Sequence, residues 1–495
     1  MEDFKEYSVA EFFKKNKHML GFSGKVKSLT TIVHELVTNS LDATEQARIL
    51  PDIKIEIYQT DENKYKVVVS DNGPGIAKEY LGKVFGKMLA GTKFHKFQQQ
   101  RGQQGIGAAG VSLYAKLTTG MPLHVISGYN NKIYTADISI DFNKNEPIIE
   151  NLTETDGDFH GVIVEGVFGD VKLDKSEYSV YEYVKRTALV NPHARFELIT
   201  NEDKIVYNRQ IDVLPPLPPE ITPHILGVSI YDFLEMAKKT QARKLRSFLI
   251  NEFDRVSEAK VQELEKITGI DFSKDPKEIS WQETEIILKA VKQMKWMAPR
   301  KDVLSPIGEE GMKRAIMNIF KTSLVITRTR NPQLLNGGIP YVVDVGLAYG
   351  GDIQKPIVMR FANKVPLLFD SSACAITKAV TSIDWKRYEV DFETAPILVA
   401  INISSVYVPY VSTGKTAIAS EDELIDEIRN SIMESARSIK TYIHQQYKAQ
   451  QLEKKRQALI RYIQYLSNDL NYLCYVDKNI IKEKLEKMIK EKYSI

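Results

Sequence analysis

The chain has 495 residues, of which 43% are hydrophobic and 26% are charged. Lys and Arg number 67 and Asp and Glu number 64, so the formal net charge is only +3. This composition excludes a fibrous or intrinsically disordered protein, and the near-neutral charge excludes a chain that is basic throughout. At roughly 150 residues per domain, we expect about three domains.

The sequence favours a cytoplasmic protein. Its two cysteines, Cys374 and Cys474, are too few for a disulfide framework or a cysteine zinc site, which indicates a reducing compartment. No apolar run is long enough to span a membrane. The first residues, Met1 to Lys5, lack the apolar core of a signal peptide.

The N-terminal part of the chain mixes helical and strand patterns. Apolar residues at the 3.6-residue period predict helices, and alternating apolar and polar residues predict strands. A short amphipathic start at residues 9–20 precedes an expected helix at 27–43, and strands are expected at 53–57, 64–70, 122–140 and 160–169. The first two strands are joined by a short polar turn, so they should pair in antiparallel fashion.

Glycines dominate the next stretch. Residues 82–110 hold seven glycines and a run of glutamines at 98–100. Glycine costs the most conformational entropy to order, so we expect a mobile loop here and not a rigid element.

The remainder of the chain falls into three blocks. Five prolines among residues 214–223 predict a stiff linker. Residues 229–300 then show a helical pattern, residues 307–410 return to strands, and the chain becomes helical again from about residue 420.

One face of the helix at 27–43 is polar. Glu35, Asn39 and Asp42 stand at i, i+4 and i+7, so they share a face opposite the apolar stripe. The amide oxygen of Asn39 can hold Mg²⁺ and leave Glu35 to deprotonate a water. A solvated polar face is the alternative. A His-Glu-x-x-His zinc motif is excluded because position 38 is threonine.

Two glycine motifs follow. Asp71, Gly73 and Gly75 come directly after the strand at 64–70, where the glycines allow a sharp turn close to a flat ligand. The Asp71 carboxylate can accept a hydrogen bond from an exocyclic amine. A plain strand-ending turn explains the same residues equally well.

The second motif is Arg101 to Gly110. Its glycine amides lead into a predicted helix and can form an anion cradle. It literally matches G-x-G-x-x-G, but a glutamine-rich loop and not a strand precedes it, so dinucleotide binding is rejected. A flexible loop that binds nothing is the alternative.

In this order, the Glu/Asn helix, the Asp-x-Gly-x-Gly turn and the glycine-rich lid resemble the GHKL (Bergerat-fold) ATPases. That family includes type II topoisomerases, MutL repair proteins, heat-shock chaperones and histidine kinases. The resemblance implies an α/β sandwich that closes a lid over ATP and Mg²⁺. It implies that Glu35 is the general base, Asn39 the Mg²⁺ ligand and Asp71 the reader of the adenine amino group.

Further nucleotide contacts are implied for Gly73, Gly75, Thr92, Lys93, Gly102, Gln103, Gln104, Gly105, Ile106, Gly107, Ala108 and Ala109. One departure is Val162, which follows His160-Gly161 where the family often has threonine.

Lys415 is a further candidate. Residues 412–416 are not a P-loop, because Pro409 stands where glycine is required. In GHKL enzymes with a second α/β domain, a lysine of that domain reaches the γ-phosphate. Lys415, in a predicted strand-to-helix loop, matches that residue and would serve catalysis and ATP binding. An exposed loop lysine is the alternative.

Several strings closely resemble the B subunits of archaeal topoisomerase VI, the type IIB topoisomerase family. They are Ala10-Glu11-Phe12-Phe13-Lys14, Asn39-Ser40-Leu41-Asp42-Ala43-Thr44, Arg360-Phe361-Ala362-Asn363-Lys364-Val365-Pro366-Leu367, Asp384-Trp385-Lys386-Arg387-Tyr388, and Pro409-Tyr410 with Gly414-Lys415. The resemblance implies an α+β multidomain protein. Its parts would be an N-terminal strap (1–20), the ATPase domain (21–222), a helix–two-turn–helix insert (223–306), an α/β transducer with a long helix (307–450) and a helical C-terminal region (451–495).

The resemblance also implies a function and partners. ATP binding would dimerise the subunit into a clamp on double-stranded DNA. The transducer would relay this closure to a DNA-cleaving A subunit, contacted by residues 451–495, in an A2B2 heterotetramer that passes one duplex through another. A MutL-like repair ATPase and a GHKL chaperone are the alternatives.

A DNA contact is implied for Trp385, Lys386, Arg387 and Tyr388, which match the family's Trp-Lys-x-Tyr element. The two cations can neutralise phosphates, and the aromatics can pack on sugars. The alternative is that both aromatics are core packing. The basic side chains between residues 437 and 456 would either line a cavity that holds DNA or form the solvent-exposed surface of a helical stalk.

Overall fold

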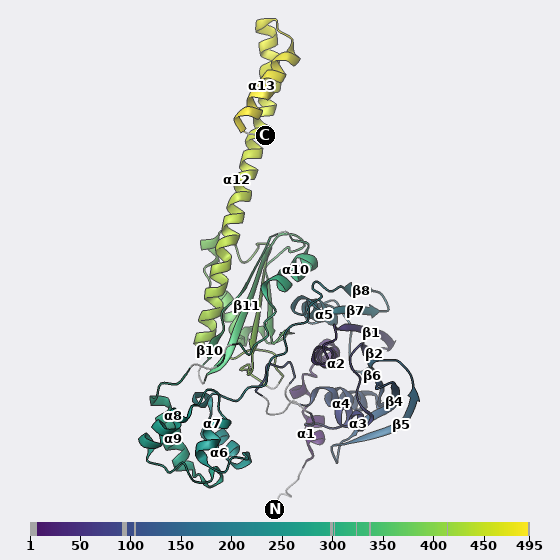
Figure 1. Cartoon of the computed structure of the whole chain (residues 1–495). Coiled ribbons are helices and arrows are strands. Elements are labelled where there is room, and N and C mark those ends of the chain that lie inside the picture. The colour runs from purple at the N-terminus through teal and green to yellow at the C-terminus, as the bar shows by residue number, and fades with distance from the viewer. Residues whose placement is uncertain are drawn as a thin grey trace, which may run out of the picture. The chain divides into compact units, whose positions relative to one another are not determined.

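The computed structural model describes residues 7–91, 97–102, 105–297, 300, 302–322, 324–335, 338–412 and 414–493. The chain forms two compact units. The first contains the residues up to Ile383 together with Glu393–Met433, and the second contains Asp384–Phe392 together with Glu434–Ile495. Figure 1 labels the helices and strands.

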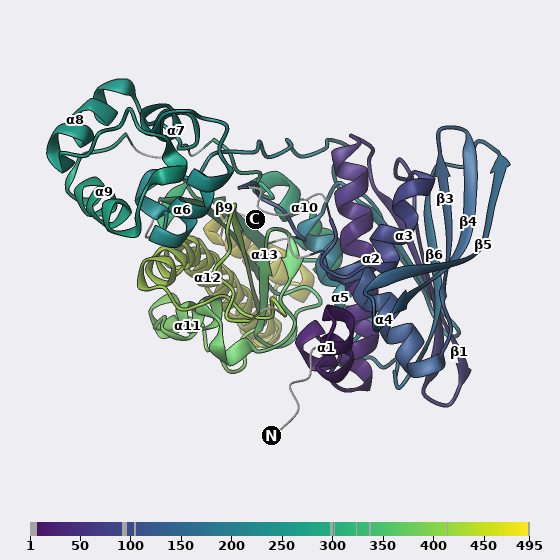
Figure 2. The ribbon, with the colours of Figure 1, turned by 90° about the horizontal axis from the view of Figure 1, so that it is seen from below.

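An eight-stranded sheet organises the N-terminal part of the first unit. Its strand order is β5-β4-β3-β6-β2-β1-β7-β8, and only the β1–β7 pair is parallel. Helices α2, α3 and α4 pack on one face of the sheet (Figure 2). The elements are α1 (Val9–Lys15), η1 (Lys17–Leu20), α2 (Lys25–Gln46), β1 (Asp52–Asp61), β2 (Lys64–Asp71), α3 (Lys78–Gly86), α4 (Gly107–Thr119), β3 (Leu123–Tyr129), β4 (Lys132–Asp141), β5 (Glu146–Asp156), β6 (Gly161–Gly169), α5 (Val180–Val190), β7 (Arg195–Thr200) and β8 (Lys204–Tyr207).

Local patterning explains these elements. In β1, Ile53, Ile55 and Ile57 are completely buried and alternate with more accessible residues, as the period of a strand requires. The apolar stripe of α2 is buried against the same core, with Leu29 and Ile32 completely inaccessible. The predicted helix at 27–43 and the antiparallel pair of strands are therefore confirmed.

The expectation of a mobile loop over residues 82–110 is wrong at both ends. Gly82 and Gly86 belong to α3, and α4 begins at Gly107. A Cβ on Gly86 would lie 2.6 Å from the Cβ of Pro147. A Cβ on Gly82 would lie 2.7 Å from Ile149. These glycines are present because α3 packs closely on β5, a strand that the sequence pattern did not predict.

A helical insert follows the proline-rich linker. Its core is built from residues that are completely buried, among them Phe233, Phe248 and Phe272. The predicted helical block at 229–300 is confirmed. It contains η2 (Ile225–Gly227), α6 (Ile230–Lys239), α7 (Leu245–Asn251), α8 (Glu258–Thr268), η3 (Pro276–Glu278) and α9 (Trp281–Gln293).

A second sheet completes the first unit. Its strand order is β10-β11-β14-β12-β13, with β9 paired to β11, and the β12–β14 pair is parallel. Leu189 and Val190 of α5 share a core with Phe361 and Leu398 of this sheet, so apolar packing joins helix α5 to the second sheet. The elements are α10 (Glu309–Phe320), β9 (Leu324–Thr329), β10 (Gln333–Leu335), β11 (Ile339–Tyr349), β12 (Ile357–Ala362), β13 (Val365–Pro366), η4 (Ser371–Ala373), α11 (Ala375–Thr381) and β14 (Ile397–Ser405).

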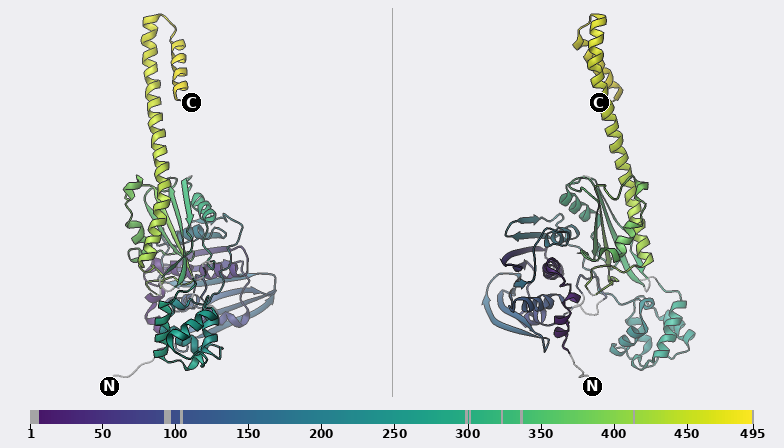
Figure 3. Two further views of the ribbon diagram at one scale, coloured as in Figure 1. Left: turned by 60° about the vertical axis from the view of Figure 1, so that its left-hand side comes forward. Right: turned by 180° about the vertical axis from the view of Figure 1, so that it is seen from behind.

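A long helix, α12 (Asp422–Cys474), begins in the first unit and continues in the second. The second unit also contains η5 (Trp385–Tyr388) and α13 (Lys478–Tyr493). Figure 3 shows α13 lying alongside the last turns of α12. Within the described ranges, no helix combines the length and the apolar character needed to cross a bilayer.

Replacing Gly86 by alanine should destabilise the protein. The added methyl would lie 2.8 Å from the Cα and 2.6 Å from the Cβ of Pro147. To remove this clash, the backbone of α3 or of β5 would have to move. Such overpacking typically costs about 1–3 kcal/mol, more than the roughly 1 kcal/mol that alanine gains over glycine in a helix. Thermal unfolding should show a lower midpoint for Gly86→Ala than for Glu79→Ala, an exposed control on the same helix. An unchanged or higher midpoint would contradict the packing role.

Candidate functional site

A cavity of about 520 Å³ lies between α2, the start of α4 and the second sheet's segments, all within the first unit. It is the place where most of the predicted nucleotide-site residues meet. Those that line it are Glu35, Asn39, Gly102, Gly105, Ile106, Gly107, Ala108, Ala109 and Lys415. Thr92, Lys93, Gln103 and Gln104 fall outside the described residues.

Helix α2 presents Glu35 and Asn39 to this cavity. They are one turn apart on one face, and Asn39 is exposed whereas Glu35 is half-buried. A Cβ on Gly107 would lie 2.0 Å from Oε2 of Glu35. A larger residue at this position would displace the Glu35 carboxylate from its present place beside the first turn of α4, a consequence that the motif alone did not reveal.

The start of α4 offers backbone donors to the same cavity. No side chain caps this helix at Ile106, and residues 105–109 line the cavity. The first amides of a helix have no intrahelical acceptor, and the helix dipole favours negative charge there. The geometry thus fits the predicted anion cradle.

Asp71 lies at the end of β2, away from the lining of this cavity. Its Oδ2 accepts a hydrogen bond from the Ser40 hydroxyl at 2.7 Å. Its Oδ1 accepts from the amides of Gly73 at 2.9 Å and Val162 at 3.2 Å. Burial raises the pKa of Asp71, although these donors oppose the rise. Ser40 follows Asn39 directly, so Asp71 is tied to the helix that carries the cavity's polar face.

Gly73 and Gly75 turn the chain after Asp71. Gly75 has a φ of +75°, and a Cβ there would lie 1.9 Å from the carbonyl oxygen of Gly128. The expected sharp turn is present, and it brings the backbone against strand β3. Neither glycine lines the 520 Å³ cavity.

Lys415 reaches the cavity from the loop between β14 and α12. Its Nζ donates to the carbonyl oxygen of Arg101 at 3.2 Å. Arg101 is the residue before Gly102, so a side chain from the loop after β14 contacts the segment that precedes α4 directly.

Sequence reasoning missed several groups around Glu35. His34 and Tyr183 line the cavity, and their ring centroids are 5.5 Å apart. Burial lowers the pKa of His34; the Glu35 charge opposes this effect and the Lys415 charge adds to it. Burial raises the pKa of Tyr183 to about 12. His34 was visible beside Glu35 in the sequence, whereas nothing local pointed to Tyr183.

Arg101 was also missed as a candidate, although it opens the glycine motif. Its guanidinium is buried and binds Asp42 and Glu45, both on α2. Asp42 therefore does not share the open polar face with Glu35 and Asn39, as its helical spacing suggested. The long sequence separation of these partners explains why no local pattern revealed them.

The donor set fits a magnesium ion that arrives with a nucleotide. Among the described residues, no group of three or more His, Cys, Asp and Glu could hold a metal ion by itself. Mg²⁺ commonly binds through one or two protein oxygens, several waters and substrate phosphates. Asn39, exposed in the cavity beside Glu35, offers such an oxygen.

The predicted DNA-contact residues lie in the second unit. Trp385 is only 6% exposed and stacks on Phe392 with ring centroids 4.6 Å apart. Lys386 and Arg387 are exposed, and Tyr388 is half-buried. Trp385 therefore packs in the interior, as the alternative of core packing expected, while Lys386 and Arg387 face solvent.

Two family models match the chain. A model of the topoisomerase VI B subunit transducer matches residues 299–455. A model of histidine kinase-, DNA gyrase B- and HSP90-like ATPases, which implies a nucleotide site, matches residues 24–142. The transducer range contains Lys415, and the ATPase range contains Glu35, Asn39 and the start of α4.

Curated relatives match almost the whole chain. The B subunit of type 2 DNA topoisomerase 6 from Pyrococcus horikoshii is 41% identical over 100% of this chain and 96% of its own length. That of Methanothermobacter thermautotrophicus is 43% identical over 93% of this chain and 91% of its own length. The ATPase region of Saccharomyces cerevisiae topoisomerase II is 11% identical over 90% of this chain and 98% of that chain, with a TM-score of 0.42, too low to support a conclusion about the fold.

The full-length matches decide against a MutL-like repair ATPase and a chaperone. A relative that is 41% identical along the entire chain leaves no block of the sequence outside the likeness. The chain therefore belongs to the family of type 2 DNA topoisomerase 6 B subunits.

Proposed function

We propose that this chain is the ATP-operated clamp of a type IIB topoisomerase, and that Glu35 is the base of its ATPase. One observation chiefly supports the assignment. Glu35, Asn39, the amides at the start of α4 and Lys415 line one cavity, although they come from three distant parts of the chain. This is the combination that positioning and charge neutralisation of a triphosphate require.

In this proposal each group has one role. Glu35 orients and deprotonates the attacking water, and the amides of residues 105–109 hold phosphate oxygens. Asn39 provides an oxygen ligand to Mg²⁺, which when bound neutralises phosphate charge. Asp71 accepts a hydrogen bond from the adenine amino group, and Gly73 and Gly75 shape the turn beside it. Thr92, Lys93, Gly102, Gln103 and Gln104 belong to the proposed lid.

Lys415 gives the proposal its coupling step. It belongs to the block that carries the second sheet, yet it lines the cavity with Glu35. If the ammonium group of Lys415 moved from the Arg101 carbonyl to the γ-phosphate, the position of that block would depend on the nucleotide. We propose that this link, together with ATP-driven dimerisation through residues 1–20, operates the clamp.

The proposed partners follow from the names of the relatives. These relatives are B subunits, so each works beside at least one further polypeptide. We propose an A subunit that cleaves DNA in an A2B2 heterotetramer, contacted through residues 451–495. Double-stranded DNA is the proposed substrate, which agrees with the predicted cytoplasmic location. The domain limits 1–20, 21–222, 223–306, 307–450 and 451–495 remain part of this proposal.

Reconstitution with the A subunit of the same organism tests the function. The complex should relax supercoiled DNA only with ATP and Mg²⁺. Glu35→Gln should lower the kcat of ATP hydrolysis by about 10²–10⁴-fold because the general base is lost, while an ATP analogue still binds. Glu56→Gln, on strand β1 and away from the cavity lining, should hydrolyse ATP normally. Unchanged turnover in Glu35→Gln would refute the assignment of the base.

Replacing Lys415 by alanine should separate binding from hydrolysis and strand passage. Loss of one preorganised positive contact to a developing phosphate charge typically costs on the order of 10²–10³-fold in kcat. ATP-analogue binding should persist, whereas relaxation in the reconstituted complex should be lost. Lys355→Ala, an exposed lysine in the same block, is the matched control. Normal relaxation by Lys415→Ala would remove this lysine from the mechanism.

We further propose that Lys386 and Arg387 contact DNA phosphates, with Trp385 and Tyr388 supporting them. The double variant Lys386→Ala/Arg387→Ala should bind duplex DNA more weakly and make the plot of log affinity against log salt less steep by about 1.8, because two phosphate contacts are lost. Lys238→Ala/Lys239→Ala removes two exposed charges from α6 and should leave the slope unchanged. Equal slopes for both variants would argue against the contact.

A further inference from the structure

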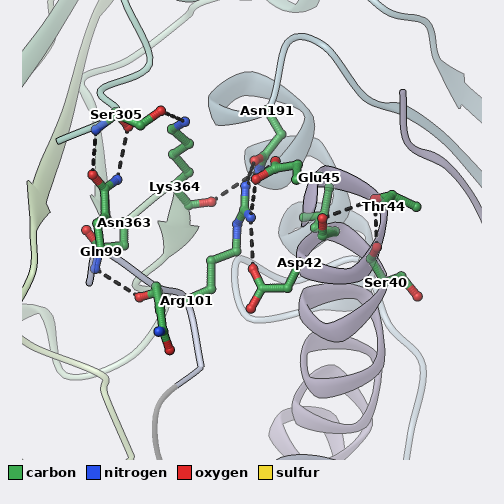
Figure 4. A network of polar contacts seen from close by, with 12 residues as sticks. Ser40, Asp42, Thr44, Glu45, Gln99, Arg101, Asn191, Ser305, Asn363 and Lys364 are labelled. Carbon is green, nitrogen blue, oxygen red and sulfur yellow. Dashed lines mark hydrogen bonds and ion pairs between the residues drawn. The ribbon is translucent and has the colours of Figure 1, made fainter. Parts of the chain in front are cut away.

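The segment that leads into the lid is tied to several parts of the first unit. The side chain of Gln99 donates to the carbonyl oxygen of Ser305 at 3.0 Å and accepts from the Ser305 amide at 2.7 Å. The side chain of Asn363, in the turn between β12 and β13, donates to the carbonyl oxygen of Gln100 at 3.0 Å. Arg101 follows Gln99 and Gln100 in the chain and is the centre of the network in Figure 4.

The guanidinium of Arg101 is bound to α2. It donates to both carboxylate oxygens of Glu45, at 2.7 and 2.8 Å, and to Asp42 at 3.0 Å. A further bond, at 2.6 Å, goes to the side-chain oxygen of Asn191. The Arg101 side chain is only 6% exposed. Burial lowers the pKa of Arg101, but the two carboxylates outweigh it and raise that pKa overall.

Glu45 is committed to this arrangement as well. Burial would raise the pKa of Glu45, yet the Arg101 charge and hydrogen bonds from His193 and Arg101 hold it well below its usual range. A planar, bidentate guanidinium–carboxylate pair has a defined direction and distance. The backbone of Arg101 is therefore placed at a defined point relative to α2, the helix that carries Glu35 and Asn39.

The main chain of Arg101, in contrast to its side chain, contacts Lys415. Its carbonyl oxygen accepts the hydrogen bond from Nζ of Lys415 at 3.2 Å. Gly102, the next residue, lines the nucleotide cavity together with Lys415. One residue thus contacts α2 through its side chain and Lys415 through its carbonyl.

We propose that Arg101 is a positioning residue for ATP hydrolysis. Its buried guanidinium binds Asp42 and Glu45, and this fixes the place from which Lys415 contacts the γ-phosphate. The carbonyl of Arg101 holds the ammonium group close to Glu35's helix before the nucleotide takes it over. This inference rests on the role of Lys415 given under Proposed function. It assigns to Arg101 no contact with the nucleotide.

The conservative variant Arg101→Lys tests the idea because it keeps the charge and removes the fork. A lysine is a single point donor and cannot hold two carboxylates in one plane. Misplacement of a catalytic group by about 1 Å can cost about 10²-fold in rate. We expect kcat for ATP to fall about 10- to 100-fold, with the KM for ATP changing much less.

A double-mutant cycle separates positioning from general damage. If Arg101 acts through Lys415, the variant Arg101→Lys/Lys415→Ala should have the same kcat as Lys415→Ala alone, because coupled residues are not additive. The measurements use the full chain reconstituted with its A subunit and DNA. The stoichiometry of ATP-analogue binding reports the fraction of folded sites, and kcat is expressed per folded site.

Arg195→Lys is the matched control. Arg195 also binds two carboxylates, Asp52 at 2.8 Å and Glu197 at 2.7 Å, but it lies outside the cavity lining. Its conversion to lysine should leave kcat unchanged in both the Lys415 and the Lys415→Ala backgrounds.

Each other outcome overturns the proposal in a recognisable way. Normal kcat in Arg101→Lys refutes it directly. An equal loss in the Lys415 and Lys415→Ala backgrounds shows that Arg101 acts elsewhere. Normal turnover in Lys415→Ala removes the premise, which is a failure of the proposed function and not of the Arg101 geometry alone.

A milder variant covers poor folding of Arg101→Lys. Asp42→Asn removes one carboxylate charge while the bidentate pair with Glu45 remains. Its kcat should fall by a smaller factor, and the loss should again disappear in the Lys415→Ala background. A loss that persists there would count against the proposal as firmly as in the first cycle.

Discussion

Two carboxylates on α2 are largely buried, and the guanidinium of Arg101 binds both of them, while the Lys364 charge also stabilises ionised Glu45. Asp42 and Glu45 would be costly to bury without a partner, and removing one member of such a pair commonly costs about 3–5 kcal/mol. The pairing with Arg101 therefore has to persist while the protein stays folded. Because the partners lie in different segments, this requirement fixes the segment around Arg101 to the helix that carries Glu35.

The requirement also limits which parts of the site can move. Residues 99–101 are held by hydrogen bonds to Ser305, Asn363 and α2, so this segment is anchored at three places. Gly102 comes next, and a Cβ there would have no heavy atom within 4 Å. Lys415 donates to the carbonyl oxygen of Arg101, so this lysine is connected to the same anchored segment.

How much of this could be predicted from the sequence depends on the range of the interactions. Helix α2 and strands β1 and β2 follow periodic patterns in neighbouring residues, so they were predicted. Strand β5 was missed because most of its residues are exposed and show no alternation. The glycines of α3 suggested mobility because their real cause, contact with Pro147, comes from a strand far along the chain.

The same reasoning applies to the site. Glu35 and Asn39 share a helical face, a relation that spacing reveals. Arg101 stood out only as the first residue of a glycine motif, because its carboxylate partners stand on α2 and local patterns carry no information about them. The assignment of Asp42 to the open face was wrong for that reason: helical spacing defines a direction, whereas the neighbour in that direction comes from elsewhere in the fold.

The small net charge of the chain acquires a physical meaning in the second unit. Trp385 is buried on Phe392, and Lys440 of α12 donates to the carbonyl oxygen of Arg387 at 3.0 Å, so the turn that bears the cations is held from within. The Arg387 side chain remains 79% exposed and is paired with Asp384 at 3.1 Å. Exposed, partly compensated cations on a firm base give a weak, salt-sensitive attraction to phosphates. In the proposed clamp, which would take up a duplex and later release it, such an attraction would suffice, whereas a uniformly basic surface would retain the DNA after each cycle.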